Sequence, residues 1–312
     1  MSRFPTILAG TLLFISVLLF APLANANDSA VEVTPTGLQF KEVRDIVIER
    51  EDLRIGKQRV DVTYVFRNTG TQDLTTEVAF PIPPYEFRIA PPGGIPSFDD
   101  FTVEVNGTPV LYRKDIRAQA RGKDVTDLLT ARKISIKDFD GLPDTEEQFT
   151  AKIGADMEKF RETGVIGGDG WPDWQVAITC HWTQTFPAGT RVTIHHRYTP
   201  YTGFRAFRNE DEDDIPVRAC LDQDAETWLN RTIPPGKEVF GSAIWLGYIL
   251  TTANNWRRPI GEFHLTIDKA PEELVSACFD RPLKTTGPTR AEIHLRNYQP
   301  TQDLQVFFLG KM

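Results

Sequence analysis

Two segments with alternating hydrophobic and polar positions stand near the start of the chain, on either side of a polar turn. In the first segment, Val60–Phe66, apolar side chains occupy the even-numbered positions. The second segment is Leu74–Phe80. Residues Asn68–Asp73 between them are rich in turn formers, and prolines at 81, 83 and 84 follow the second segment. Such alternation is typical of half-buried strands, and prolines interrupt a ladder, so we predict a β-hairpin here.

Two further hairpins are predicted. Phe101–Val105 alternates before Asn106-Gly107, a pair that suits a type I′ turn, and Pro109 predicts an edge position for the return strand. Later, Trp174–Phe186 and Arg191–Tyr198 alternate on either side of a short turn. If these two strands pair with each other and their apolar residues share one face, His181 lies opposite His195 on the polar face. Cys180 then lies opposite His196 on the apolar face.

A helical insert is predicted between the β-rich parts. Val125–Arg132 has helical spacing, and an apolar stripe with period 3.6 follows a capping box at Asp144–Glu147 and ends at Gly164. The fold class is therefore mainly β, with two packed antiparallel β-sandwich-like units and a short helical insert. We predict a leader at residues 1–26, an N-terminal sandwich at 27–113, the insert and linker at 114–168, and a C-terminal β-rich domain at 169–312.

The first 26 residues resemble a signal peptide. Arg3 precedes the apolar run Ile7–Phe20, and Ala24-Asn25-Ala26 fits a cleavage signal. An uncleaved anchor is the alternative, but the run is short for a membrane span and no later stretch approaches the required length. The sequence thus predicts cleavage after Ala26, a mature chain without a membrane span, and a periplasmic or extracellular location.

Composition and charge narrow the function classes. The 312 residues carry 35 basic and 43 acidic side chains, a formal net charge of −8, and the leader contributes one arginine and no acid. This acidic balance argues against binding to nucleic acid. Export permits disulfides, and three pairings of the cysteines are possible; their neighbours favour Cys220 with Cys278 and a buried thiol at Cys180, with two free thiols as the alternative.

Several phrases together resemble one family. They are Tyr64-x-Phe66-Arg67-Asn68, Val78-Ala79-Phe80-Pro81, Cys220-x-Asp222, Asn255-Trp256-x-x-Pro259-Ile260-Gly261-x-Phe263 and Leu274-Val275-Ser276-x-Cys278. The chain is similar to exported bacterial proteins known only as a domain of unknown function. That resemblance implies a Gram-negative envelope protein and favours the Cys220–Cys278 pairing, but it supplies no catalytic residue. A weaker likeness, over Val60–Tyr112, is to the β-sandwich module of vault and inter-α-trypsin inhibitor proteins, which suggests protein contacts.

Candidate chemistry is sparse. His181 facing His195 could form half of a metal site, but a site needs three or four ligands and no carboxylate stands at an obvious position beside them. The G-x-S-x-G and H-E-x-x-H signatures and a Cys–His nucleophile phrase are all missing from the sequence. We therefore expect no cofactor, no metal and no catalytic residue, and treat an enzyme as the lesser alternative.

A polar loop with an aromatic residue is the predicted contact surface. It contains Asn255, Trp256, Arg257 and Arg258. Aromatic residues in loops often contact partners, although a loop tryptophan can equally anchor its own loop. The sequence favours an exported, non-enzymatic binding protein whose partner is another envelope protein or a glycan. The alternative is a periplasmic hydrolase acting on glycan or peptide, with carboxylates that meet only in the fold.

Overall fold

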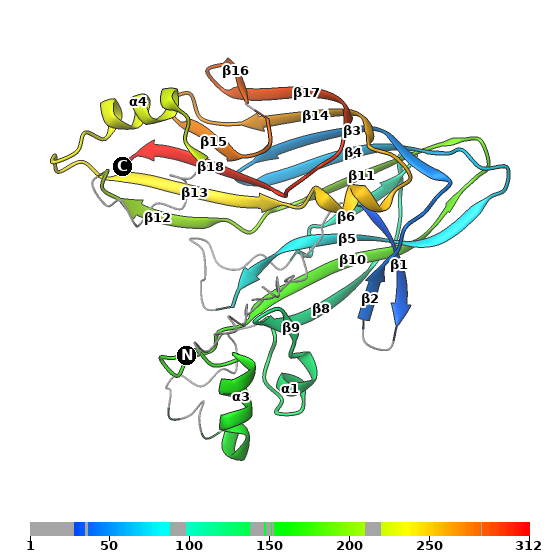
Figure 1. The fold of residues 1–312 in the computed structure, drawn as a ribbon, viewed down its shortest axis with the longest axis horizontal. Coiled ribbons are helices and arrows are strands. Elements are labelled where there is room, and N and C mark those ends of the chain that lie inside the picture. The colour runs from blue at the N-terminus through cyan, green and yellow to red at the C-terminus, as the bar shows by residue number, and fades with distance from the viewer. Residues whose placement is uncertain are drawn as a thin grey trace, which may run out of the picture.

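The computed structural model describes residues 28–34, 37–87, 98–137, 147, 151, 153–209, 220–281 and 283–312. Its fold is mainly β, as predicted, and its described strands form three sheets (Figure 1). The predicted leader and the capping box at Asp144 lie outside the described residues. None of the helices in the described ranges is long and apolar enough to cross a bilayer.

The first sheet has six strands, in the spatial order β2 (Gly37–Phe40), β1 (Ser29–Thr34), β5 (Leu74–Glu86), β10 (Gln175–Phe186), β8 (Arg113–Ala120) and β9 (Lys123–Asp124). The second has eight strands, in the order β16 (Lys284–Gly287), β17 (Arg290–Tyr298), β14 (Ile260–Asp268), β3 (Ile46–Gly56), β4 (Arg59–Asn68), β11 (Arg191–Tyr198), β6 (Thr102–Val105) and β7 (Thr108–Pro109). The third has four strands, β12 (Gly203–Phe207), β13 (Gly241–Tyr248), β18 (Leu304–Lys311) and β15 (Leu274–Cys278).

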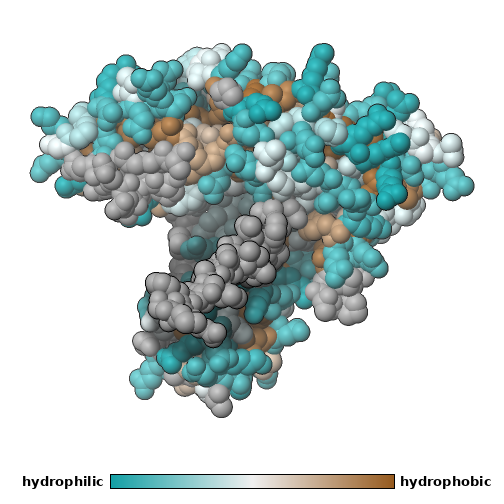
Figure 2. All heavy atoms as spheres, in the orientation of Figure 1, coloured by the Kyte–Doolittle hydropathy of each residue, from teal (hydrophilic) through white to brown (hydrophobic). Residues whose placement is uncertain are grey.

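Alternation along the strands decides which side chains enter the core. Val60, Val62, Tyr64 and Phe66 of β4 are all buried, whereas their neighbours are not, as the sequence pattern predicts. One large core joins the inner faces of all three sheets. Figure 2 shows the polar side chains that remain on the visible outer surface. The β14–β3 pair is parallel, whereas the other strand pairs in the described sheets are antiparallel.

The predicted hairpin around Asn68–Asp73 is wrong, because its two strands lie in different sheets. β4 pairs with β3 and β11 in the eight-stranded sheet, whereas β5 pairs with β1 and β10 in the six-stranded sheet. The turn therefore carries the chain from one sheet to the other. The same alternate residues are buried whether the two strands share a sheet or lie in different sheets. Alternation alone therefore cannot distinguish the two arrangements.

The predicted hairpin of Trp174–Phe186 with Arg191–Tyr198 is wrong for the same reason. β10 pairs with β5 and β8, and β11 pairs with β4 and β6. His181 therefore does not lie opposite His195. Its backbone neighbours are Ala79 and Arg113, and those of His195 are Thr63 and Glu104.

Other local predictions are confirmed. Asn106 and Gly107 have φ angles of 50° and 78°, as a type I′ turn requires, and β7 with Pro109 is an edge strand. In the insert, α1 (Thr126–Thr130) falls within the predicted helical segment. The 3₁₀ helix η1 (Gly154–Asp156) leads into α3 (Met157–Thr163), which ends at Gly164 with a φ of 80°.

The four-stranded sheet buries both of its faces. One face joins the main core, and the other packs under α4 (Gln223–Thr232) around a smaller cluster that includes Phe207, Leu229 and Phe307. The Cys220–Cys278 disulfide, with Cα atoms 5.0 Å apart, ties the segment before α4 to the edge strand β15. The predicted pairing is confirmed.

The six- and eight-stranded sheets both take strands from either side of the predicted boundary at residue 169. The predicted N-terminal and C-terminal units thus share their hydrogen-bonded sheets. Division into separately folding domains stays a prediction.

Cys180 is fully buried on β10, and burial raises the pKa of its thiol to about 12. Because the thiolate is the reactive form, we expect the native protein to resist iodoacetamide at pH 8. In denaturant without reductant one thiol per chain should react, and after reduction three. Mass spectrometry of the alkylated chain measures each step. Labelling of Cys180 at a free-thiol rate in the native protein would contradict this burial.

Candidate functional site

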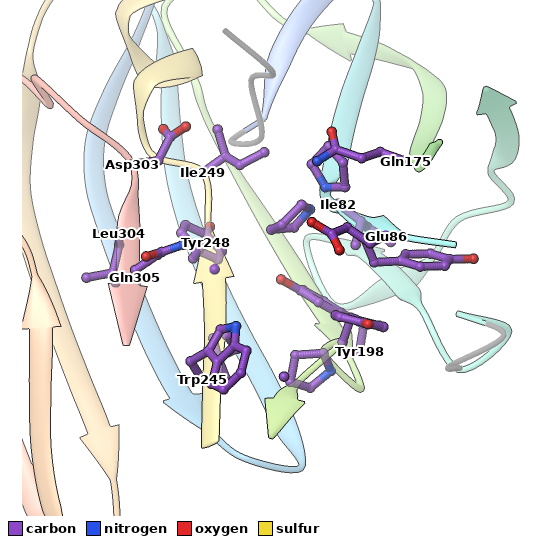
Figure 3. A pocket seen from close by; sticks show the side chains of 18 residues that line it. Ile82, Glu86, Gln175, Tyr198, Trp245, Tyr248, Ile249, Asp303, Leu304 and Gln305 are labelled. Carbon is purple, nitrogen blue, oxygen red and sulfur yellow. The ribbon is translucent and has the colours of Figure 1, made fainter. Parts of the chain in front are cut away.

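A cavity of about 450 Å³ opens where the end of β5 and the start of β10 face β13 (Figure 3). All three sheets contribute to its wall. The lining residues are 82–86, 175, 198, 200, 201, 203, 245–249 and 303–305. Its volume falls in the range that holds small ligands, and its lining is mainly apolar with a few polar groups, as in many binding sites.

Aromatic rings form much of this wall. Tyr85 and Tyr201 stack with ring centroids 5.0 Å apart and planes inclined by 17°. Trp245 of β13 is half-buried and lies against the backbone of Gly203, its partner on β12. A Cβ atom at position 203 would collide with the indole ring, so glycine allows the ring to lie flat on the neighbouring strand.

One residue of the wall has a buried polar atom without a partner. The Tyr198 side chain is 1% exposed, and its hydroxyl has no hydrogen-bond partner among the described residues. Burial raises the pKa of this hydroxyl, which keeps it protonated and able to donate. A buried polar atom without a partner costs free energy. Tyr198 lines the cavity, but its hydroxyl has almost no accessible surface and is closed to it.

The other polar groups of the wall divide into two sets. Glu86, Gln175 and Gln305 are exposed at the rim and offer amide and carboxylate groups. Asp303 is already engaged, because its Oδ1 accepts hydrogen bonds from the Leu250 amide (3.0 Å) and from the amide (3.0 Å) and hydroxyl (2.8 Å) of Thr251. The rim side chains are therefore the adaptable partners of a ligand.

A buried network lies behind the cavity wall. The Tyr248 hydroxyl is 2.7 Å from that of Tyr64, and burial, together with the charge of Glu51, raises the pKa of both. In the same core Asp28 Oδ1 lies 2.9 Å from His196 Nε2, and both side chains are 0% exposed. Because these groups are closed to solvent, we assign them to holding the wall in place.

The predicted contact loop has buried and exposed members. Trp256 is 4% exposed, lies against Phe66 and Phe186 with centroids 5.1 and 6.1 Å away, and donates from Nε1 to the Asp28 carbonyl. Its position fits the alternative of a loop anchor. The amide of Asn255 donates to Ser29 Oγ at 2.9 Å.

The two arginines of the loop are exposed. The Arg257 guanidinium donates to Thr69 Oγ1 at 2.9 Å. A partner contact through Arg257 and Arg258 stays a prediction. Neither residue belongs to the cavity wall, so that contact would be separate from the cavity.

The two histidines singled out from the sequence each take a different carboxylate. His181 Nδ1 lies 2.6 Å from Glu77 Oε1, and His195 Nε2 lies 2.9 Å from Asp61 Oδ1. They belong to different sheets, so the predicted histidine pair is not formed. Hydrogen bonds to these histidines help to lower the pKa of both carboxyls despite partial burial.

Sequence reasoning missed most of the cavity. Trp245, Tyr85, Tyr198 and Tyr201 were not among the candidate site residues named from the sequence. The signal available in the sequence is an aromatic residue next to proline at two strand ends, Pro84-Tyr85 and Pro200-Tyr201. It becomes meaningful only when the sheet order brings those ends together.

The comparisons with known proteins give a family and distant structural likenesses. Residues 26–307 match the family described as "Domain of unknown function (DUF4424)". None of the curated proteins matches the sequence.

Among solved structures, a "putative nutrient binding protein" from Legionella pneumophila is similar at 16% identity and a TM-score of 0.43, covering 92% of this chain and 70% of that one. An M1 zinc metallopeptidase from Deinococcus radiodurans is similar at 9% identity and a TM-score of 0.31. The likeness covers 86% of this chain and 43% of the peptidase. At these scores neither likeness carries an argument about function.

The packing of Trp256 gives a prediction for the loop. Trp256→Ala should lower the free energy of unfolding by about 3–5 kcal/mol, because it removes a large buried ring. Arg258→Ala is the control and should change it by less than about 0.5 kcal/mol, since its side chain is exposed. Urea denaturation followed by circular dichroism measures both. Wild-type stability of Trp256→Ala would show that the ring is no anchor.

Proposed function

The chain belongs to the DUF4424 family of unknown function, and we propose that it is an exported, β-rich binding protein of the bacterial envelope. Its ligand is a saccharide held in the cavity between β5, β10 and β13. The observation that carries this proposal is the aromatic lining of the cavity, where Tyr85 stacks on Tyr201 and Trp245 lies against Gly203.

The chemistry of the wall suits a sugar ring. One face of a pyranose presents C–H groups, which pack on flat aromatic rings such as Trp245 and Tyr201, while its hydroxyls need donors and acceptors around the edge. Glu86 supplies a carboxylate at the rim, and Gln175 and Gln305 supply amide groups there. A mainly apolar wall with a few polar groups is the usual composition of a small-ligand site.

Binding is favoured over hydrolysis by the placement of the acids. Among the described lining residues the carboxylates are Glu86 and Asp303, and three donors already engage Asp303. The buried carboxylates Asp28 and Glu51 lie in the core and do not line the cavity. A periplasmic hydrolase remains the alternative, and it would need Glu86 to act with an acid from outside this wall.

Two features support an envelope location. The leader at residues 1–26 has the pattern of a cleaved signal peptide, and the family match begins at residue 26. The Cys220–Cys278 disulfide fits an oxidising compartment such as the periplasm.

The test is to titrate the mature protein with soluble cell-wall oligosaccharides and to measure binding by isothermal calorimetry. Trp245→Ala should weaken binding at least tenfold, because it removes the stacking surface. Gln305→Ala should weaken it about threefold to tenfold and leave stability unchanged, since it removes an exposed amide at the rim. Phe240→Ala, an exposed aromatic outside the cavity, should bind as the wild type does.

Failure of the oligosaccharides to bind, or equal binding by Trp245→Ala and the wild type, would contradict the proposal. If extended peptides bound instead and the same variants lost them, the cavity would be a peptide site. Hydrolysis of an oligosaccharide that depends on Glu86 would favour the enzyme alternative.

A further inference from the structure

A single row of polar side chains crosses the outer face of the eight-stranded sheet. The register of five neighbouring strand pairs places its members side by side from β6 to β17, in the order Glu104, His195, Thr63, Asp52, His264 and His294. Their sequence neighbours point into the core, as Leu53, Leu265 and Ile293 show. The row is therefore a consequence of sheet register and cannot be read from any one segment.

Three potential metal ligands meet at the β17 end of this row. His264 lies directly opposite His294, and Glu292 stands two residues before His294, hence on the same face. The two imidazole rings have centroids 3.6 Å apart and planes inclined by 24°. One ligand atom from each of His264, Glu292 and His294 lies within 4.8 Å of the other two.

We propose that His264, Glu292 and His294 bind a Zn²⁺ ion on the outer face of the eight-stranded sheet. Two imidazoles and one carboxylate form a donor set that zinc uses in open, three-ligand sites. In a tetrahedral site with bonds of ~2.0–2.1 Å, two ligand atoms lie roughly 3.4 Å apart. The side chains need to close by about an ångström, which rotation of partly exposed groups on a surface allows.

The surroundings of His264 favour metal binding. Its Nδ1 lies 3.7 Å from Asp52 Oδ1, and its Nε2 lies 3.4 Å from Thr266 Oγ1. Thr266 is the strand neighbour of Glu292, so the Nε2 edge faces the ligand set while the Nδ1 edge faces a carboxylate. Asp52 also pairs with Arg50 at 2.7 Å, and a carboxylate behind a histidine ligand is a common supporting arrangement where it hydrogen-bonds the ring.

The charge of the set also fits, because a carboxylate and two imidazoles are ligand types that zinc prefers. Lys284 on β16 is the strand neighbour of Glu292, but Glu292 forms no ion pair with it or with any arginine in the described part of the chain. The carboxylate can therefore turn toward a cation.

His195, on the same outer face, differs from His264 in the charged groups around it. His195 shares the Asp61 carboxylate with Arg59 and Arg197, at 2.9 Å, 2.5 Å and 3.2 Å. Two guanidinium groups beside a carboxylate oppose the approach of a cation. His195 is thus a matched control on the same row.

Three protein ligands leave one coordination position for a further donor. His264 and Asp52 also border a shallow hollow of about 330 Å³ lined by Arg54, Arg59 and His195. Water or an anionic group entering from this hollow could complete the coordination. The site is separate from the aromatic cavity, whose lining shares none of these residues.

The experiment uses tag-free mature protein stripped with EDTA and titrated with ZnCl₂ by isothermal calorimetry. We expect one Zn²⁺ per chain, with a dissociation constant on the order of a micromolar or lower. His264→Ala and His294→Ala should each weaken binding at least tenfold, Glu292→Gln should also weaken it, and His195→Ala should bind like the wild type. Co²⁺ loaded into the wild type should give the visible bands of a tetrahedral site, and His264→Ala should lose them.

Melting temperatures of the metal-free variants separate loss of ligands from loss of fold, and we expect them to match the wild type because these side chains lie on the surface. Absence of Zn²⁺ binding by the wild type would overturn the proposal. So would unchanged binding by both His264→Ala and His294→Ala. Equal losses in His195→Ala would place the ion elsewhere on the row and contradict this ligand set.

Discussion

The fold depends on two neighbouring crossings of the chain between the same two sheets. β4 leads into β5 and β10 leads into β11, so each pair passes from one sheet to the other, and the four strands pair antiparallel in both sheets. Asn68 holds the crossings together. Its side-chain amide donates to the carbonyls of Phe186 (2.8 Å) and Gln72 (2.9 Å), and its backbone amide donates to Thr190 at 3.1 Å. A buried amide with every group bonded defines one register.

This arrangement also places the cavity. The crossings join the six- and eight-stranded sheets at one end, and the two sheets separate toward the other end, where β5 finishes and β10 begins (Figure 1). The four-stranded sheet fills part of the resulting wedge, and the cavity lies where its β13 meets those strand ends. Large aromatic rings from these strand ends line the gap that remains. The buried Asp28–His196 pair and the Trp256 indole fix the segments that enter the core near the crossings, at a desolvation cost that an apolar core would avoid.

The sequence predicted local structure well and strand pairing poorly, for a physical reason. Parity identifies the inward face of a strand, and it was correct for β4 and for Cys180 on β10. The Asn106-Gly107 turn and the helix end at Gly164 were also predictable, because their backbone angles require particular residues. The alternation of buried and exposed residues is the same, however, whether a turn joins two strands of one sheet or carries the chain to a second sheet. The expected contact of His181 with His195 failed on that ambiguity, and the cavity, which collects residues from three sheets, was beyond reach.

The strand register, which could not be predicted from the sequence, gives the eight-stranded sheet two distinct faces. On β14, Phe263 and Leu265 enter the core while His264 between them stands outside, level with Asp52 on β3 and His294 on β17. A slip of one residue in the parallel β14–β3 pair would bury His264 and expose Leu265. Burial of the core side chains therefore fixes the positions of the outer row as well as those of the inner face. Side chains on a rigid sheet lose little further freedom when they bind an ion, which is why a surface row can be a site although none of its members is buried in a pocket.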